Sequence, residues 1–497
     1  MLHKRIRLPS LHSRITSAAE AAALVKDGMT LGLSGCGCSG DAKAVPYALI
    51  ERARHSPLTV SLVTGASIGN GIDGKLAEVG LVSRRKPFQA DPALRRAINS
   101  GKVMFVDQHL SETAEQMRHG QIDPPDIMVV EAVAITEQGH IVPTSSVGNS
   151  GLLVQMAKQV IVEININTSL DWEGLHDIYL PEVRPNRSPM AITRSEDRIG
   201  TSAIPLDPDK IVAIVISEYS DAPATILPPD EDTRRIADHL IGFLKDEVDA
   251  GRLSNNLAPL QVGVGSIANA VMSGLADSPF EDLIMWSEIL QDSTFELMDA
   301  GKLKFASATS VILTEALGQR VFSNIGEYSD KIVLRPQDVS NHPEVIRRLG
   351  PISINTALEF DLYGNVNSTL IGGTDIMNGI GGSGDFARNT FMSIFVTKST
   401  AKNGAISRVV PMVSHVDHIQ QDIDILVTEQ GLADLRDLAP RERAKLIIEH
   451  CAHPDYREAL WAYFDKACAK GGYTPHDLSE ALSWHVNLEN HGRMLVS

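Results

Sequence analysis

Apolar and polar residues follow two patterns along this chain, continuous apolar runs and apolar residues at helical spacing. Short, continuous apolar runs predict strands at residues 29–33, 59–64, 103–106, 127–135 and 159–164. Between these runs, segments 18–25 and 43–54 carry apolar residues at helical spacing. Buried strands that alternate with amphipathic helices are typical of a largely parallel sheet covered by helices on both faces. The pattern therefore predicts an α/β fold.

A break in this pattern divides the chain. Residues 220–233 contain three prolines and four acidic residues, which is typical of a linker. A long helix is predicted over 233–250. Strands and helices then alternate again to about residue 450, and a mostly helical tail covers 455–497. We therefore predict two domains, at 1–220 and 221–497.

The two predicted domains share local sequence patterns. Residues 133–144 and 358–369 both read as a strand, a glycine turn and a returning strand. Four positions match at an offset of 225 residues: Ile135 with Phe360, Gly139 with Gly364, Ile141 with Val366, and Thr144 with Thr369. A second match, at an offset of 228 residues, pairs Gly35 and Gly37 with Gly263 and Gly265. Two matches at nearly one offset indicate a duplicated α/β domain, and a cleft between such halves is a natural ligand site.

Composition narrows the classes of partner and location. The 497 residues include 62 acidic and 45 basic residues, a net charge of −17, which argues against binding nucleic acid. No apolar run is long enough to cross a membrane. Four cysteines form no disulfide framework and favour a reducing compartment. The basic first 19 residues are similar to a transit peptide but lack the apolar segment of a secretory signal, so we expect a cytoplasmic protein, with an organelle as the alternative.

Two glycine motifs have the form of known catalytic or cofactor-binding turns. Gly35, Gly37 and Gly40 form G-x-G-x-x-G between a strand and a helix, but the next strand, 59–64, lacks the acid that binds a dinucleotide ribose. NAD binding is therefore disfavoured. Residues 65–69 form G-x-S-x-G around Ser67, the form of a serine hydrolase nucleophile elbow. We interpret Ser67 as a cleft-wall residue.

Histidine and cysteine pairs raise two further alternatives. His415 and His418 are candidate partners for a nucleophilic serine, but nothing in the sequence selects either one. A metal site needs three or four converging ligands, so structural roles are favoured for the histidines. Cys36 and Cys38 lack further ligands at zinc-finger spacing, which favours packing in a tight turn.

Glu288 follows the apolar run 283–286 and precedes a predicted helix. In an open α/β sheet, ligands bind at the carboxyl ends of strands. A carboxylate there can act as a nucleophile towards an activated acyl group. The glycine-dense segment 378–386 supplies backbone N–H groups of the kind that stabilise the resulting oxyanion. The alternative is a solvated acid at a helix start, stabilised by the helix dipole.

Three long segments, 332–341, 377–388 and 427–436, resemble the acetyl-CoA hydrolase/transferase family of class I acyl-CoA:carboxylate CoA-transferases. Within that family, the chain is most similar to the type that acts on succinyl-CoA and acetate. The resemblance covers residues from about 14 to 495. It implies two tandem, related open α/β domains with the active site at their interface. It also implies a homodimer, with coenzyme A as a substrate and no metal or other cofactor.

The resemblance also implies roles for individual residues. Residues 287–292 match the family motif around its nucleophilic glutamate, which makes Glu288 the catalytic residue. The matched oxyanion and substrate-binding positions are Ser67, Val264, Asn341, Gly382 and Glu429. The matched CoA-binding glycines are Gly263, Gly265, Gly381, Gly382 and Gly384. The chain departs from the family at Cys36, Cys38 and Ser266, so these positions leave the substrate open.

The expected function follows from this resemblance. CoA would move between a short-chain acyl-CoA, such as succinyl-CoA, acetyl-CoA or propionyl-CoA, and a carboxylate such as acetate or succinate, through a glutamyl-CoA thioester. The expected partners are therefore acyl-CoA and small carboxylates, with neither nucleic acid nor membrane. One alternative is net hydrolysis of acetyl-CoA, and another is a non-catalytic regulator that binds CoA.

Overall fold

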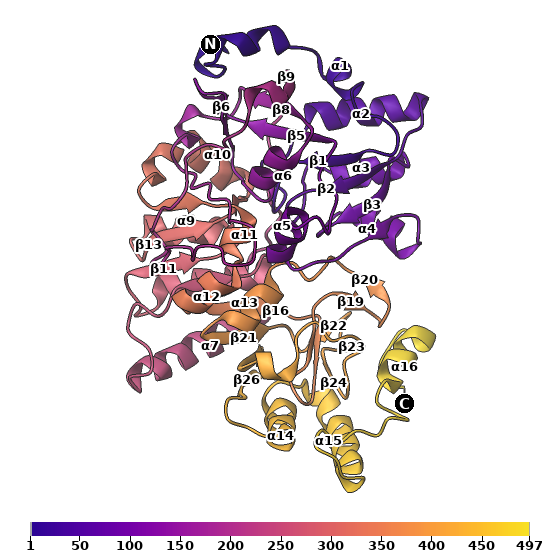
Figure 1. The fold of residues 1–497 in the computed structure, drawn as a ribbon. Coiled ribbons are helices and arrows are strands. Elements are labelled where there is room, and N and C mark those ends of the chain that lie inside the picture. Colours follow the sequence, from indigo (N-terminus) through magenta and orange to yellow (C-terminus); the bar gives the residue numbers. More distant parts are fainter. Residues whose placement is uncertain (1, 497) are drawn as a thin grey trace. The chain divides into compact units, whose positions relative to one another are not determined.

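The computed structural model describes residues 2–496 of the chain (Figure 1). Met1 and Ser497, the outermost residues of the two predicted domains, lie outside the described residues. The described chain divides into two compact units. The first unit runs to Thr225 and also contains Met285–Phe295 and Lys304–Leu349; the second contains Ile226–Ile284, Glu296–Leu303 and the chain from Gly350 onward. The predicted division of the sequence into two related domains stays a prediction.

A seven-stranded parallel sheet forms the centre of the first unit. In sheet order, its strands are β4 (Met104–Phe105), β3 (Val82–Lys86), β2 (Val60–Val63), β1 (Thr30–Leu33), β5 (Ile127–Ala132), β8 (Gln159–Asn165) and β9 (Ile211–Ser217). All six residues of β5 are buried, as expected for a central strand of a covered parallel sheet. The α/β class predicted from the apolar pattern is confirmed.

Helices separate most of these strands. They are α1 (Ala18–Ala22), α2 (Ala44–His55), α3 (Ile72–Glu78), α4 (Pro92–Asn99), α5 (Leu110–Arg118) and α6 (Ser150–Met156). The starts of two helices follow directly from sequence. Ser17 and Glu20 form a capping box at α1. Asp91 caps α4, whose first residue is Pro92.

Two glycine hairpins match the predicted repeat. β6 (Ala134–Ile135) pairs antiparallel with β7 (Ile141–Val142), and β17 (Glu359–Asp361) pairs antiparallel with β18 (Val366–Asn367). Ile135 lies opposite Ile141, and Phe360 lies opposite Val366. The predicted strand–turn–strand pattern is therefore confirmed at both places. The predicted strand at 127–135 is two strands, because the chain leaves the sheet after Ala132 to begin the hairpin.

The second unit contains a parallel run of strands with one antiparallel strand at the edge. β10 (Leu260–Val262), β16 (Ile352–Thr356), β21 (Met392–Val396) and β25 (Ile425–Thr428) are parallel neighbours, and β26 (Gly431–Asp434) is antiparallel to β25. Its helices are α7 (Glu231–Asp249), α8 (Ser266–Gly274), α13 (Ser383–Asn389), α14 (Pro440–His450), α15 (Pro454–Ala469) and α16 (Ser483–His491). The last two confirm helices in the tail, with a non-helical segment at 470–482 between them.

The remaining elements are short. Between residues 283 and 349 they are β11 (Leu283–Trp286), β12 (Ile289–Leu290), α9 (Asp292–Asp299), β13 (Leu303–Ala308), β14 (Ser310–Val311), α10 (Glu315–Ser323), β15 (Ile332–Leu334), α11 (Gln337–Ser340) and α12 (Pro343–Leu349). Later pieces are β19 (Leu370–Ile371), β20 (Asp375–Ile376), β22 (Thr400–Ala401), β23 (Ile406–Ser407) and β24 (Val409–Val410). The 3-10 helices are Leu2–Lys4, Pro9–Arg14, Leu170–Trp172, Pro208–Lys210, Leu275–Asp277, Ile325–Tyr328 and Gln420–Asp422. Among residues 2–496, no helix has the length and apolar character needed to cross a membrane.

Candidate active site

Glu288 lies between β11 and β12 in the first unit. Its backbone carbonyl accepts a hydrogen bond from the Thr309 N–H at 2.9 Å, and the N–H of Ser287 donates to Ser307 O at 2.9 Å. Just before it, the buried indole of Trp286 donates from Nε1 to Ser340 O at 2.8 Å. The apolar strand β11 therefore ends at Trp286, whose side chain is held by a hydrogen bond. This bond, together with the backbone bonds of Ser287 and Glu288, positions the Glu288 side chain.

The Glu288 carboxyl is deep in the protein, although part of the residue stays accessible to solvent. Burial raises the pKa of Glu288 to about 7, because a desolvated carboxylate is disfavoured relative to the neutral acid. The side chain of Asn341 acts in the opposite direction and lowers this pKa. The carboxyl is therefore close to half ionised at neutral pH, as suits a nucleophile that must also leave.

Asn341 lies immediately after α11 and is completely buried. Its backbone N–H donates to Gln337 O at 2.9 Å. Its interaction with Glu288 falls outside ordinary hydrogen-bond geometry, and neither Oδ1 nor Nδ2 has another hydrogen-bond partner among residues 2–496. A buried amide without partners costs about 1–3 kcal/mol. This cost is repaid when a ligand completes the bonds, so the amide is available for recognition.

The first glycine-rich turn, which contains Cys36, lies near Glu288. The Ser310 hydroxyl donates to Cys36 O at 2.6 Å, and Cys36 Sγ lies 3.7 Å from Gln337 Oε1. A Cβ on Gly65 or Gly148 would lie 2.9 Å from Cys36 Cβ, so both neighbours are too close for any side chain. Burial, followed by the charge of Glu288, raises the pKa of the Cys36 thiol. This departure from the family therefore lies close to the candidate nucleophile.

Ser67 contacts a thiol in the same unit. Its Oγ lies 3.4 Å from Cys38 Sγ, and its carbonyl accepts from the Cys38 N–H at 3.3 Å. Burial raises the pKa of Cys38 to about 11, so the thiol is neutral at physiological pH. Ser67 is 3% exposed. Among residues 2–496, the hydrogen-bond partner of the Ser67 hydroxyl is this neutral thiol, which is not the base that a serine nucleophile needs, and this favours the wall interpretation.

Two predicted turns lie in the second unit. Gly263, Val264 and Gly265 connect β10 to α8, with the Gly263 N–H donating to Ile354 O at 2.9 Å. Gly265 has a φ of +126°, a conformation that favours glycine. Val264 is 54% exposed, so its position is open to a ligand rather than part of the core. Ser266, the third departure from the family, begins α8.

The second of these turns precedes α13. Gly381 has a φ of +58°, and Gly382 immediately precedes the first helical residue, Ser383. The Ser383 hydroxyl donates to Ile380 O at 2.8 Å, which closes the turn around the two glycines. Gly384 follows inside α13. The structure therefore places Gly381 and Gly382 on the turn and Gly384 in the first turn of α13, and the Ser383 side chain bonds back across the two turn glycines.

Glu429 follows β25 in the second unit and is 7% exposed. It accepts hydrogen bonds from the Ser399 N–H at 2.7 Å, from the Ser399 hydroxyl, and from Gln430 Nε2 at 3.0 Å. Burial opposes ionisation, but these hydrogen bonds outweigh it and lower the pKa of Glu429. Glu429 also lines a cavity of about 410 Å³ with Arg235, Asp238, His239 and Gln430.

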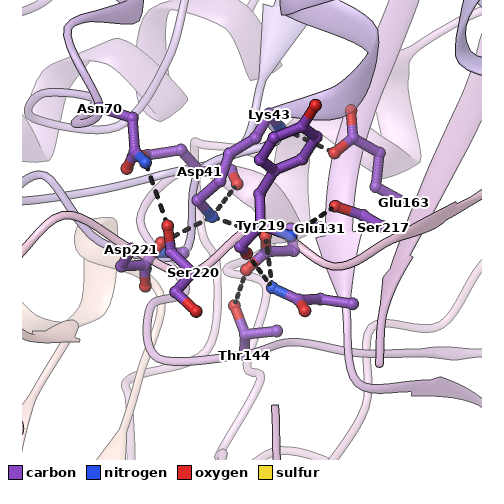
Figure 2. Close-up of polar contacts among 12 residues, drawn as sticks. Asp41, Lys43, Asn70, Glu131, Thr144, Glu163, Ser217, Tyr219, Ser220 and Asp221 are labelled. Carbon is purple, nitrogen blue, oxygen red and sulfur yellow. Dashed lines mark hydrogen bonds and ion pairs between the residues drawn. The ribbon is translucent and has the colours of Figure 1, made fainter. Parts of the chain in front are cut away.

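Sequence reasoning missed a buried charged cluster in the first unit (Figure 2). Lys43 Nζ lies 2.7 Å from Glu131 Oε2 and 2.6 Å from Asp221 Oδ1. The Glu163 carboxylate accepts from the N–H groups of Lys43, Ala44 and Val45 at the start of α2. An acid inside an otherwise apolar strand, as in β5 and β8, is the signal that was available.

This cluster borders a cavity of about 620 Å³ in the first unit. Asp221 forms part of the lining, but its Oδ2 already accepts from Ser145 Oγ at 2.8 Å and from the Gly40 N–H at 2.9 Å. Arg5, also in the lining, donates to backbone carbonyls among the described residues, including those of Val133 and Thr168. These polar groups already form hydrogen bonds within the protein, so the cavity is a weaker candidate site than the Glu288 region.

Models of two domains of one protein family match this chain. The acetyl-CoA hydrolase/transferase N-terminal domain matches residues 2–216, and the C-terminal domain of the same family matches residues 318–464. A structure of RipA from Yersinia pestis is similar in fold, with a TM-score of 0.70, 23% identity, and coverage of 92% of this chain and 97% of that chain. Together these matches cover both halves of the sequence.

Curated relatives match at higher identity over nearly the full length. Succinyl-CoA:acetate CoA-transferase of Clostridium kluyveri is 46% identical, covering 99% of this chain and 92% of the relative. Acetyl-CoA hydrolase of Yarrowia lipolytica is 44% identical, covering 99% and 98%. Propanoyl-CoA:succinate CoA transferase of Escherichia coli is 42% identical, covering 96% and 98%. The chain therefore belongs to the acetyl-CoA hydrolase/transferase family.

Proposed function

We propose that this chain is an acyl-CoA:carboxylate CoA-transferase in which Glu288 is the nucleophile. One observation carries the proposal: a strand-end carboxyl whose pKa is raised to about 7 lies beside Asn341, a buried amide without other partners. Desolvation makes a carboxylate more reactive, and the free amide offers hydrogen bonds to an acyl oxygen. The family membership of the chain and the match of 287–292 to the nucleophile motif support the same role.

The proposed reaction exchanges one acyl bond for another in balanced steps. A Glu288 carboxylate oxygen bonds to the thioester carbon, the C–S bond breaks, and the sulfur leaves as a thiolate. The thiolate then attacks the glutamyl carbonyl of the mixed anhydride, which releases the first carboxylate and leaves an enzyme–CoA thioester. A second carboxylate reverses the sequence. Excluding water conserves the energy of the thioester throughout.

The other predicted residues take supporting roles in this proposal. Asn341 positions the acyl group, Glu429 orients the site, and Ser67 forms part of a wall. The N–H groups of Gly382 and Val264 stabilise the oxyanions. CoA contacts the glycines at 263, 265, 381, 382 and 384. Matching positions in the family support these roles, and no metal or cofactor beyond CoA takes part.

We further propose short-chain substrates and a cytoplasmic homodimer. The C. kluyveri relative is named for succinyl-CoA and acetate, and the E. coli relative for propanoyl-CoA and succinate. Cys36, Cys38 and Ser266 depart from the family, so the acyl pair is proposed only as a class: succinyl-, acetyl- or propionyl-CoA with acetate or succinate. A panel of these pairs, assayed by the CoA ester formed, identifies the preferred combination.

Hydrolysis of acetyl-CoA is a second candidate function, because the Y. lipolytica relative is named for it. The nucleophile would be the same, with water as the final acceptor. Release of free thiol from acetyl-CoA, measured with and without an added carboxylate, separates the two activities. A transferase forms a new CoA ester only when a carboxylate is present, whereas a hydrolase releases thiol without it.

Trapping the covalent intermediate tests the proposed nucleophile. The protein is incubated with acyl-CoA, treated with borohydride, and digested for mass spectrometry. Reduction of a glutamyl-CoA thioester converts the side-chain carboxyl to an alcohol, and we expect this change at Glu288. Transfer that proceeds while Glu288 stays unmodified would overturn the mechanism. The matched control is Glu281, an exposed acid before the same strand, which should stay unmodified.

A further inference from the structure

His418 contacts Ser383, the first residue of α13, next to the glycine turn that contains Gly381 and Gly382. It is 2% exposed, and its Nε2 lies 3.1 Å from Ser383 Oγ and 3.3 Å from Ser368 Oγ. Its ring packs on Phe395, with 4.8 Å between ring centroids. Its backbone exchanges two hydrogen bonds with Val366, at 2.8 and 3.1 Å. Both the backbone and the ring of His418 are therefore held in place.

The surrounding hydrogen bonds assign a proton to Nε2. Ser383 Oγ donates to Ile380 O at 2.8 Å, and Ser368 Oγ donates to Asp417 Oδ2 at 3.4 Å. A hydroxyl has only one proton to donate, so both serines face the imidazole as acceptors. His418 therefore donates from Nε2, to Ser383 at the shorter distance.

The bond to Ser383 controls the shape of the turn. Ser383 Oγ reaches back to Ile380 O across Gly381 and Gly382. Glycine peptides adopt many conformations at low cost, and Gly381 already has a φ of +58°. The hydroxyl that spans them limits this freedom, and the imidazole fixes the direction of the hydroxyl.

We propose that His418 is a positioning residue for the CoA-transfer reaction. Through Ser383, it holds the peptide N–H of Gly382 in the orientation that stabilises the oxyanion. This inference rests on the proposed function, in which Gly382 is an oxyanion donor. An oxyanion donor that is misoriented costs rate rather than binding, because the charge forms only in the transition state.

Paired substitutions test this role. In His418→Gln, the amide nitrogen reaches about as far as Nε2 and can still donate, whereas His418→Leu has similar bulk and no donor. We expect His418→Leu to lower kcat by about 10- to 100-fold with the KM for acyl-CoA changed less than about threefold. His418→Gln should stay within about fivefold of wild type. Ser383→Ala should match His418→Leu, and the double variant should lose no more than either alone.

The matched control is His415→Leu, because that side chain is 44% exposed and its ring contacts Asp417 at 3.2 Å. Its kcat should equal that of wild type. Wild-type kcat in His418→Leu, or an equal loss in His418→Gln and His418→Leu, would overturn the proposal.

A second measurement separates this inference from the proposed function. If wild type transfers no CoA with any substrate pair, the proposed function is wrong, and the role of His418 is then read from amide hydrogen exchange. Exchange in a peptide covering 378–386 should be faster in His418→Leu than in wild type or His418→Gln. Unchanged exchange in His418→Leu would show that the histidine does not hold the turn.

Discussion

At the scale of single residues, Glu288 shows a conflict between stability and reactivity. Burial raises its pKa to about 7, against 4.5 for a free glutamate. The folded state therefore holds its proton over a pH range in which the unfolded chain has released it. The titration of Glu288 therefore lowers the free energy of unfolding as pH rises from about 4.5 to about 7, and above that range the full loss is present. Such a penalty is expected where a desolvated acid serves the chemistry rather than the fold.

Glu288→Gln should abolish transfer and stabilise the protein in a pH-dependent way. The neutral amide carries no ionisation penalty, at about 1.4 kcal/mol for each unit of pKa shift. Relative to wild type, the free energy of unfolding should rise by less than about 1 kcal/mol at pH 5 and by about 3 kcal/mol at pH 8. Urea unfolding at both values measures the difference. A stability difference that does not change with pH would contradict the raised pKa.

Asn341→Ala should move the pH dependence of transfer to higher pH. Asn341 lowers the pKa of Glu288, so its removal leaves the carboxyl harder to ionise. The acidic limb of kcat/KM should shift upward, and the rate on the plateau should fall by about 10- to 100-fold from lost positioning. Ser340→Ala is the matched control, because this neighbouring buried hydroxyl has no hydrogen-bond partner among residues 2–496. An unshifted limb in Asn341→Ala would exclude the interaction.

At the scale of elements, the two glycine hairpins offer a matched comparison. Gly139 and Gly364 both have positive φ, +83° and +91°. A Cβ on Gly139 would lie 2.5 Å from Cγ of the rigid Pro208 ring, whereas on Gly364 it would meet the flexible Leu435 at 3.2 Å. The same turn is therefore more tightly enclosed in the first unit than in the second.

Alanine at these positions should destabilise to different extents. Gly364→Ala should cost about 1–2 kcal/mol from its left-handed backbone alone. Gly139→Ala should add about 1–3 kcal/mol from overpacking against the proline ring. Gly120→Ala is the control for backbone cost, because Gly120 has a φ of +71° and open space around it. Thermal unfolding ranks the three variants, and a larger loss in Gly364→Ala than in Gly139→Ala would contradict this packing argument.

Several elements with one dominant pattern were predicted from sequence, although β9 was not, despite its continuous apolar run over residues 211–216. An element stabilised mainly by tertiary pairing was not predicted either. The apolar runs of β1, β2 and β8 specified their strands, and the glycine hairpins were visible as a repeat. β3 was missed because its Val-Ser-Arg-Arg-Lys sequence lacks an apolar run. Its Arg85 is buried, and Asp73 accepts two hydrogen bonds from its guanidinium at 2.9 Å. That pairing joins residues twelve positions apart and has no local sequence signal.

In the candidate site, too, some features were predicted from the sequence and others were not. Glu288 was identified from its place after an apolar strand and from the motif around it. The unpaired state of the Asn341 amide depends on what the fold places around α11, so sequence alone did not reveal it. The Lys43 cluster was missed for a related reason: Glu131 and Glu163 lie in separate strands that only the parallel pairing of β5 with β8 brings side by side, and Asp221 lies in a segment after β9.

At the scale of the whole molecule, the net charge of −17 opposes the approach of an anionic substrate. CoA carries several negative charges on its phosphates. Like charges on protein and ligand slow their encounter, and salt screens this repulsion over a Debye length of about 30 Å at 0.01 M and about 10 Å at 0.1 M. For an acyl-CoA substrate, kcat/KM should therefore rise by about two- to fivefold between these salt concentrations.

An acyl-pantetheine substrate gives the matched comparison, because it presents the same thioester without the charged nucleotide. Its kcat/KM should be nearly independent of salt, since long-range repulsion requires charge on both partners. A salt effect of the same size on both substrates would instead indicate a change in the protein itself. A kcat/KM for acyl-CoA that falls with salt would contradict the prediction. It would mean that a local basic surface attracts the nucleotide strongly enough to outweigh the repulsion from the excess of acidic residues, of which the chain has 62 against 45 basic ones.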